Sequence, residues 1–302
     1  MEKSKTKKNK KVDYVIAIPS YKRAETLRDK SLATLKHYNI DPKRIDIFVA
    51  NKDEEAIYKD TLDPKSYHKI IVGVPKIGPQ RNFISDYYPI NKPVVHMDDD
   101  IKRFIEYVPN TKLHEKTLVS LERLIQKGFA EAKKANARLW GIYPTPNGFF
   151  MSEKIDTDLR FIIGCFNGMY NPGTKGGKGI KLQLDMDKED YERTLRFYIA
   201  DGAVVRLRYA APKTAYYTEK GGNQEYRTRK TIMDGAKWIV KHFPEYATLN
   251  LKKKSGFPEV RLRDRTKEKE KEKEKEKEKE KEKEKEKSKG AKKSKTLKKK
   301  KQ

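Results

Sequence analysis

The sequence contains very little cysteine and no long apolar run. Its 302 residues include a single cysteine, so neither a disulfide framework nor a multi-cysteine zinc site can form within the chain. Cys165 lies in the apolar stretch FIIGCFNG, which predicts an inert, buried thiol. No stretch of about 20 apolar residues is present that could span a membrane, and the lysine-rich N-terminus lacks the apolar segment of a secretory signal. The sequence therefore predicts an intracellular, soluble protein without a membrane span, compatible with a nuclear, host-cell or viral-factory compartment.

Positive charge is abundant and is concentrated at the two ends of the chain. Lysine and arginine number 71 against 44 acidic residues, which gives a formal net charge of +27. The segment Lys267–Glu286 is a Lys-Glu repeat with no apolar face, which indicates a solvated spacer. The lysines at both ends are typical of polyanion binding by counterion release, of a localisation signal or of a solubility tail. We expect a basic arm over residues 1–11, one folded domain over 12–251 and a charged tail over 252–302.

Between the tails, the first half of the chain alternates strand-like and helix-like segments. Three strand–helix–strand units in succession indicate an α/β fold with a mostly parallel, Rossmann-like central sheet flanked by helices. In such sheets ligands bind beyond the carboxyl ends of the strands, so chemistry is expected there. The second half is less regular, and its clearest amphipathic pattern predicts a helix over His114–Ala135. The predicted strands of the first half cover Val12–Ile18, Ile45–Ala50, His68–Val74 and Lys92–Met97.

Three adjacent aspartates, Asp98, Asp99 and Asp100, follow the last of these strands. Adjacent carboxylates repel one another, and a hard divalent cation such as Mg²⁺ or Mn²⁺ allows them to stay ionised together. A turn or a helix N-cap is the plainer interpretation of aspartates at this position. A triplet at the end of a parallel strand favours the metal site, which would leave open positions for diphosphate oxygens.

Two turns at the ends of other predicted strands carry further candidate residues. The turn Pro19–Arg23 would place main-chain groups and Tyr21 near a nucleotide base and ribose. The segment Gly78–Asn82 begins a helix whose free N–H groups face the same sheet edge. Arg81 in this segment would contact a phosphate or pair with the aspartates, and Asn82 would hydrogen-bond a sugar or base. A plain structural ion pair is the alternative for Arg81.

A carboxylate cluster lies far along the chain from the aspartate triplet. Such a cluster is a candidate for the general base that deprotonates an acceptor hydroxyl group. The alternative is a solvated helix start, with Asp187 as N-cap and Asp190 at the capping-box position. The five acidic residues of the cluster are Asp185, Asp187, Glu189, Asp190 and Glu192.

Two further features are less specific. The glycine-rich loop Asn171–Gly179 would either close over a bound donor or simply tolerate insertions. The five histidines show no paired metal-ligand spacing, and His96, in the strand before the aspartates, is expected to be buried.

Taken in order, these motifs resemble the GT-A nucleotide-sugar glycosyltransferases. The succession IPSYKRAETL, IFVANKDEEAIY, GVPKIGPQRNFI and VVHMDDDI is similar, more narrowly, to the TET/JBP-associated glycosyltransferases. That family occurs in viruses, phages and some eukaryotes and is inferred to glycosylate hydroxymethylated pyrimidines in DNA. The resemblance implies a GT-A fold, a nucleotide-sugar donor of the UDP-linked kind, Mn²⁺ or Mg²⁺ as cofactor, and 5-hydroxymethylpyrimidine in DNA as the acceptor.

The resemblance also implies roles for individual residues on the donor side. Asp98 and Asp100 match the Asp-x-Asp motif, in which the last aspartate binds the metal and the first contacts the donor ribose or the metal. Six further residues fall where that family binds the donor: Pro19, Ser20, Tyr21, Arg23, Arg81 and Asn82.

On the acceptor side, Lys188-Glu189-Asp190 resembles the acidic motif that supplies the catalytic base in inverting members. Asp190 is the first candidate for that base and Glu189 the second. Both inverting and retaining chemistry are compatible with the sequence. The second predicted strand departs from the family pattern, because it runs into Ala50–Asp53 instead of an Asp-Asp-x-Ser motif, so a base-recognition role for Asp53 is not implied.

Three other functions are compatible with the same residues. The first is a glycosyltransferase whose acceptor is a protein, a glycan or a small molecule, with tails that only localise the enzyme. A nucleotidyltransferase also uses clustered aspartates and a metal, but it releases pyrophosphate. A non-catalytic nucleic-acid-binding module would retain the triplet as a structural turn.

Overall fold

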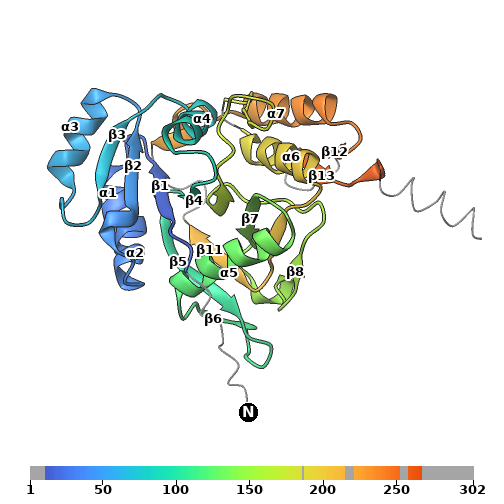
Figure 1. The fold of residues 1–302 in the computed structure, drawn as a ribbon, viewed down its shortest axis with the longest axis horizontal. Coiled ribbons are helices and arrows are strands. Elements are labelled where there is room, and N and C mark those ends of the chain that lie inside the picture. The colour runs from blue at the N-terminus through green and yellow to red at the C-terminus, as the bar shows by residue number, and fades with distance from the viewer. Residues whose placement is uncertain (1–10, 186, 215–220, 252–257, 267–302) are drawn as a thin grey trace, which may run out of the picture.

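The computed structural model describes residues 11–185, 187–214, 221–251 and 258–266, and within them the chain forms an α/β fold. Its main sheet has eight strands in the order β3-β2-β1-β4-β9-β7-β10-β8 (Figure 1). Strands β8 and β9 run opposite to the other six, which confirms a mostly parallel sheet. The strands are β1 (Val15–Pro19), β2 (Ile45–Val49), β3 (Lys69–Val72), β4 (Pro93–Met97), β7 (Leu139–Ile142), β8 (Ile155–Asp156), β9 (Phe166–Tyr170) and β10 (Val205–Leu207).

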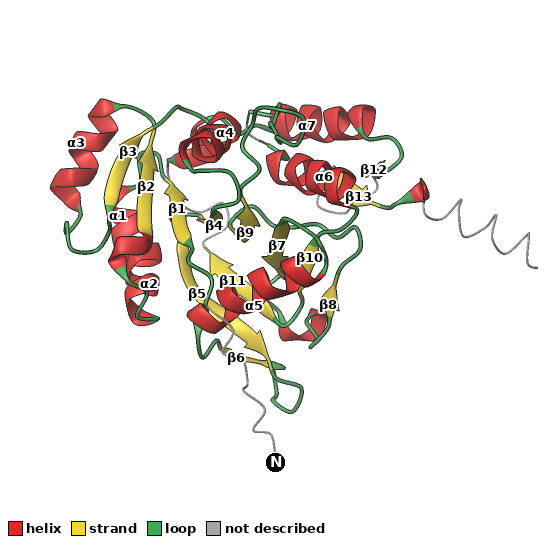
Figure 2. Ribbon diagram, viewed as in Figure 1, coloured by secondary structure: helices red, strands yellow, loops and turns green. Residues whose placement is uncertain are grey.

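Helices cover both faces of this sheet (Figure 2). The first helical segment is interrupted between its two α-helical parts by a π-helical turn, Arg28–Leu32. Among the described residues, no helix is both long enough and apolar enough to cross a membrane. The helices are α1 (Ala24–Leu27), α2 (Ala33–His37), α3 (Lys52–Thr61), α4 (Ile77–Tyr87), α5 (Leu121–Lys134), α6 (Glu189–Asp201) and α7 (Arg229–His242).

The apolar core lies in two layers because strand side chains alternate between the faces of the sheet. In β1, Ile16 and Ile18 join the layer that contains helix residue Leu35, whereas Ala17 joins the opposite layer. In β2, Phe48 faces that opposite layer, together with Ile84 of α4. The alternating apolar pattern of the first half therefore packs helices on both sides, as expected for a doubly wound sheet.

The second half departs from the simple alternation. Strand β9 inserts antiparallel between β4 and β7. Directly after the aspartates, the chain enters β5 (Ile101–Tyr107), which pairs antiparallel with β11 (Ala210–Thr214) and β6 (Glu115–Thr117) in a second sheet. The helix predicted to start at His114 is therefore wrong over its first turns. Its register is set by Ser120, whose side chain accepts a hydrogen bond from the Arg123 backbone N–H and caps α5.

A two-stranded ribbon extends the folded part of the chain beyond the boundary expected at residue 251. Strand β12 (Ala247–Asn250) pairs antiparallel with β13 (Glu259–Leu262). Val260 is 4% exposed and packs in the same layer as Ile239 of α7, and the Tyr198 hydroxyl group donates a hydrogen bond to Asp264. The described fold thus runs to Thr266. The basic arm and the Lys-Glu repeat lie outside the described residues.

Candidate active site

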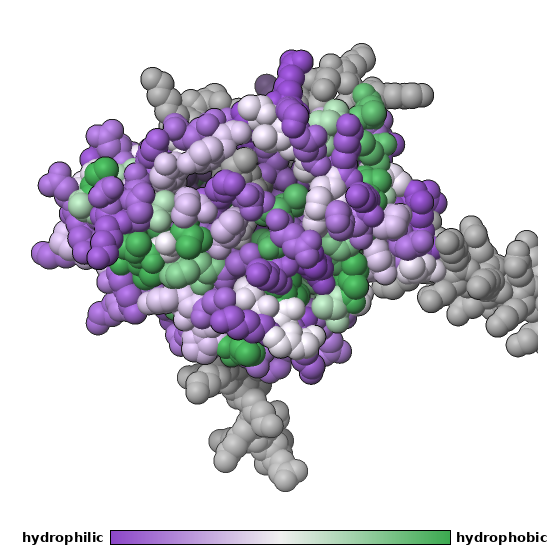
Figure 3. All heavy atoms as spheres, turned by 90° about the horizontal axis from the view of Figure 1, so that it is seen from above, coloured by the Kyte–Doolittle hydropathy of each residue, from purple (hydrophilic) through white to green (hydrophobic). Residues whose placement is uncertain are grey.

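One cavity of about 810 Å³ gathers residues from distant parts of the chain. It receives side chains from the ends of β1 and β4, the starts of α4 and α6, and the loops after β7 and before α7. Figure 3 views the molecule from above, and that face is mostly hydrophilic with scattered apolar patches. Nine of the ten residues that the sequence predicted for the site line this cavity: Pro19, Ser20, Tyr21, Arg23, Arg81, Asp98, Asp100, Glu189 and Asp190.

The three aspartates have different environments. Asp99 is 4% exposed, accepts a hydrogen bond from Ser20 Oγ at 2.6 Å and pairs with Arg23 at 3.2 Å. Asp98 and Asp100 are partly exposed on the cavity wall. The middle carboxylate therefore anchors the turn to the end of β1, and the outer two face the space where a ligand would bind.

The π-helical turn between α1 and α2 supports the aspartate turn from behind. Ser31 Oγ donates to the carbonyl oxygen of Asp98 at 2.6 Å and accepts from the backbone N–H of Ile101 at 3.0 Å. Thr34, one turn later, donates to the carbonyl oxygen of Ile101 at 3.0 Å. A π-turn shifts the helical register by one residue, and such turns are frequent at functional sites. This support was missed in the sequence, where the segment predicts an ordinary amphipathic helix.

Charge repulsion is strong within the triplet. Burial, with Asp98 and Asp99 adding like charge, raises the pKa of Asp100 to about 7. Burial raises the pKa of Asp99 to about 6, although Arg23 and Ser20 act in the opposite direction. A divalent cation would offset this repulsion, and carboxylate oxygens are suitable donors. Within the described ranges no group of three or more acidic, histidine or cysteine side chains could hold a metal ion, so a cation at Asp98 and Asp100 would need its remaining ligands from a bound substrate and water.

Arg81 connects the aspartate turn with the acidic segment. Its side chain is 3% exposed. Its Nε donates a hydrogen bond to Glu189 Oε1 at 2.9 Å. Its Nη2 donates to two acceptors, Asp98 Oδ1 at 3.2 Å and the Gly164 carbonyl oxygen at 3.1 Å. Nη1 lies 3.1 Å from His96 Nδ1. Burial and the nearby Arg81 hold the pKa of His96 well below its usual range, so the imidazole is neutral and accepts this hydrogen bond.

Gly78 allows α4 to approach the acidic segment closely. Its backbone N–H donates to the carbonyl oxygen of Asp185 at 2.8 Å. A Cβ atom at this position would lie 1.9 Å from the carbonyl oxygen of Leu184, which no side chain permits. The glycine of the Gly-x-x-Arg-Asn segment is thus required by backbone contact, and this contact places Arg81 beside Glu189.

The acidic cluster divides into supporting and cavity-facing residues. Asp190 lines the cavity, and burial followed by the charge of Glu189 raises its pKa to about 7. The alternative interpretation of the sequence placed Asp187 at the N-cap of α6, and this is wrong. The cap is Lys188, in the left-handed region at φ 72°, and Asp187 instead accepts hydrogen bonds from Arg227 and Thr231 at 2.7 Å each.

The other two acids of the cluster also support backbone and side chains. Glu192 is completely buried and accepts hydrogen bonds from the backbone N–H groups of Gln183 and Leu184 at 2.8 Å each. Asp185 pairs with Lys76 at 2.7 Å. Three of the five acids, Asp187, Glu189 and Asp190, line the cavity, and Asp187 is already paired with Arg227 and Thr231.

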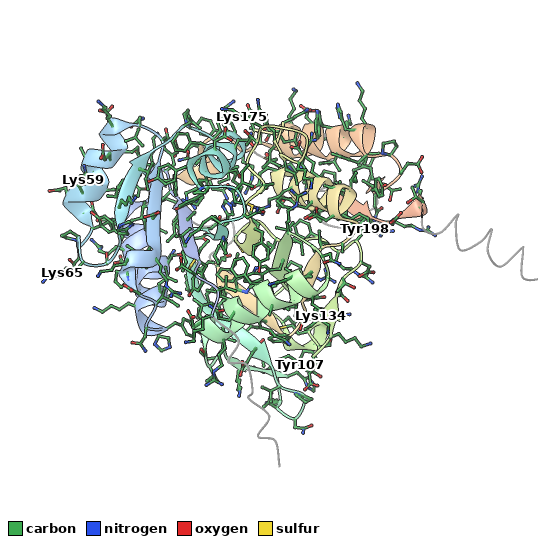
Figure 4. All side chains as sticks on the ribbon, in the orientation of Figure 1. Lys59, Lys65, Tyr107, Lys134, Lys175 and Tyr198 are labelled. Carbon is green, nitrogen blue, oxygen red and sulfur yellow. The ribbon has the colours of Figure 1, made fainter. Side chains whose placement is uncertain are left out.

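Two sequence candidates lie outside the cavity. Asn82 donates to the carbonyl oxygen of Leu182 and accepts from its backbone N–H, both at 2.9 Å, so it fixes a loop rather than facing the cavity. The glycine-rich loop Asn171–Gly179 contributes no residue to the described cavity wall. Figure 4 shows Lys175 of this loop at the outer edge of the molecule near α4.

A segment near α7 that carried no clear signal in the sequence closes over the first turn. Gly222 N–H donates to the carbonyl oxygen of Tyr21 at 2.9 Å. The rings of Tyr21 and Tyr226 lie 6.3 Å apart between centroids at 17°, and Lys22 pairs with Glu225 at 3.2 Å. The Gly-Gly pair was the one local hint, because Gly222 and its neighbour adopt positive φ.

An apolar part of the cavity wall was also missed in the sequence. Phe161 and Tyr191 stack with centroids 4.2 Å apart, and both line the cavity beside Asp190. Pro144 and Pro146, from the loop after β7, complete this wall. The cavity wall thus combines two groups of carboxylates with two aromatic pairs, Tyr21–Tyr226 and Phe161–Tyr191.

Comparisons with known proteins do not assign a family to the chain. No family model and no curated protein sequence matches the chain. Among solved structures, a fragment of TarS from S. aureus is similar to this chain, with a TM-score of 0.43 and 12% identity over 76% of this chain. The complex of the same fragment with UDP is similar with a TM-score of 0.42 and 14% identity over 76% of this chain. The chain covers 66% of that fragment. A 4-diphosphocytidyl-2C-methyl-D-erythritol synthase from Anaerococcus prevotii is similar with a TM-score of 0.38 and 12% identity over 76% of this chain and 96% of that one.

Proposed function

We propose that the protein is a metal-dependent glycosyltransferase of the GT-A type that moves a sugar from a nucleotide-sugar, of the UDP-linked kind, to a hydroxyl acceptor. The observation that carries this proposal is the position of Arg81. It joins Asp98, on the side suited to a metal and diphosphate, to Glu189, the neighbour of Asp190, across one cavity. Donor-side and acceptor-side carboxylates are thereby held in a fixed relation, as a group transfer between two bound substrates requires.

The donor would lie between the first turn and the aspartates. Main-chain groups of Pro19–Arg23 and the ring of Tyr21 suit a base and ribose, and Tyr226 adds a second aromatic ring nearby. Asp98 and Asp100 would hold Mn²⁺ or Mg²⁺, which supplies neutralisation of the diphosphate leaving group.

Asp190 would act as the general base. Its pKa, raised to about 7, is close to physiological pH, where a base combines a useful ionised fraction with proton affinity. The carboxylate takes the proton of the acceptor hydroxyl group as the hydroxyl oxygen bonds to the anomeric carbon. The bond from that carbon to the diphosphate oxygen breaks, and the nucleoside diphosphate leaves with the bonding electron pair.

The acceptor we propose is 5-hydroxymethylpyrimidine in DNA. The aromatic wall of Phe161 and Tyr191 lies beside Asp190 and suits a planar base. The net charge of +27 would favour encounter with a polyanion. Extrusion of the modified base from the duplex would cost about a few kcal/mol.

One reaction mixture tests donor, acceptor and metal together. The full-length protein is incubated with Mn²⁺, UDP-glucose or UDP-GlcNAc, and DNA that contains 5-hydroxymethylcytosine or 5-hydroxymethyluracil. Nucleoside mass spectrometry and release of UDP are followed in parallel, with Asp100→Asn as the control. We expect a hexose or N-acetylhexosamine mass gain on the modified base that is absent from the control and abolished by EDTA.

The remaining outcomes separate the alternatives. Release of UDP without a DNA product would retain the transferase and exclude this acceptor in favour of a protein, glycan or small molecule. Release of pyrophosphate from a nucleoside triphosphate would indicate a nucleotidyltransferase. Nucleotide binding and turnover that are equal in the Asp100→Asn variant and the wild type would contradict the enzyme and favour a binding module. Deletion of residues 267–302 should leave turnover on a short acceptor unchanged and raise the KM for long DNA.

A further inference from the structure

A second buried arginine lies behind the acidic pair. Arg193, on α6, is 3% exposed, and none of its three guanidinium nitrogens has a hydrogen-bond partner among the described residues. Arg81, equally buried, uses every guanidinium nitrogen. A buried charge without a partner is strongly unfavourable, so the environment of Arg193 must compensate it in another way.

The complementary group is on the same helix. Glu189 Oε1 is bonded to Arg81, but Glu189 Oε2 is buried and has no partner within the described part of the chain. Glu189 and Arg193 are four residues apart on α6, so their side chains lie on one face. A buried acceptor without a donor and a buried donor without an acceptor thus occur one helical turn apart.

The charge of Glu189 is among those that act on Arg193 in these buried surroundings. A small hollow of about 10 Å³ borders Arg193, Arg81 and His96, and Glu189 is not among the residues that line it. The charged or titratable groups that act on Arg193 are Arg81 from α4, His96 and Asp98 from β4 and the turn after it, and Glu189 and Asp190 from α6.

We propose that Arg193 is a positioning residue whose buried charge holds the free oxygen of Glu189 by electrostatic attraction, so that Glu189 is fixed between two guanidinium groups. Glu189 is then an anchor that sets the start of α6, and it does not act on the acceptor hydroxyl group. Asp190, its neighbour, is left as the single carboxylate that takes the acceptor proton. The role of Asp190 rests on the proposed glycosyl transfer, whereas the link between Arg193 and Glu189 does not.

The link is tested by stability alone. Thermal unfolding is measured for Arg193→Met, Glu189→Gln and the double variant, with Lys59→Met as a control, since Lys59 is exposed and pairs with Glu55 four residues away on α3. We expect each of the first two variants to lower the Tm by about 6–12 °C, because each leaves a buried charge without its partner. The double variant should lose no more than one single variant. Additive losses, or a loss for Arg193→Met no larger than that of the control, would overturn the link.

The functional consequence is tested by kinetics. Arg193→Met should lower kcat about 10–100-fold with the KM for the nucleotide-sugar unchanged, and Arg193→Lys should recover part of the loss. Glu189→Gln should retain more activity than Asp190→Asn. Coupling in stability together with wild-type kcat in Arg193→Met would show a structural role only. If the wild type transfers no sugar, the stability cycle still decides the link, so the two failures are distinguishable.

Discussion

The two sides of the cavity are built in different ways. The proposed donor side comes from one continuous stretch, β1 to the aspartates, in which each strand is followed by a helix or a turn at the same edge of the sheet. The proposed acceptor side is assembled from the loop after β7, the loop before β9 and the start of α6, which lie apart in the sequence. Regular strand–helix units thus position one set of groups by topology, and the other set depends on a few buried polar contacts.

Arg81 is the contact on which the relation between the sides depends, so its loss should have the largest effect. Arg81→Met leaves Glu189 and Asp98 without their shared donor, and we expect the free energy of unfolding to fall by about 3–5 kcal/mol in urea denaturation. Arg28→Met is the control, because Arg28 is exposed and pairs with the adjacent Asp29. Equal stabilities of the two variants would show that the sides are held together by other contacts.

The pH dependence of stability should distinguish the donor side next. In metal-free protein the pKa of Asp100 is raised from 3.8 to about 7, so its contribution to stability is present below about pH 4 and is lost as the pH rises through 7. Asp100→Asn removes this loss. As the pH rises from 4 to 8, the unfolding free energy of the variant should increase relative to that of the wild type by on the order of 2–3 kcal/mol. A constant difference across that range, or an equal gain in the exposed Asp185→Asn control, would contradict the prediction.

Truncation should show how far the folded domain extends along the chain. Ending the protein after Leu251 removes β13 and the buried Val260, which should lower the unfolding free energy by about 2 kcal/mol. Ending it after Thr266 removes none of the described contacts and should change stability by less than about 0.5 kcal/mol. Chemical denaturation of both forms checks this, and equal stabilities would place the domain boundary back at residue 251.

The smallest expected effect concerns the segment that bridges the two sides. Tyr226→Ala removes one of two aromatic rings near the proposed base site and should weaken UDP binding about 3–10-fold in calorimetric titration. Tyr226→Phe keeps the ring and should bind like the wild type. A dissociation constant unaffected by the alanine variant would exclude Tyr226 from nucleotide binding.

The sequence predicted the first half of the fold in more detail than the second half. Alternating apolar residues, broken by Pro19 and by the aspartates, were sufficient to place β1, β2, β3 and β4 and the turns that follow them. The helix predicted from His114 failed because β6 finds its partner in β5, and that pairing is not visible in the amphipathic pattern. Asn82 was assigned to the donor, but its amide is satisfied by the Leu182 backbone instead.

By itself, the sequence determined the fold class, the sheet edge at which polar residues gather and the excess of positive charge, because each follows from local periodicity or composition. The tertiary structure decided which of the gathered residues meet. Arg81 reaches Glu189 across 108 positions of sequence, and Tyr226 reaches Tyr21 across 205. Strand β9 enters between β4 and β7 against the direction of both. Contacts of this kind arise from how packed elements satisfy buried charges and backbone groups, and no local pattern of residues encodes them.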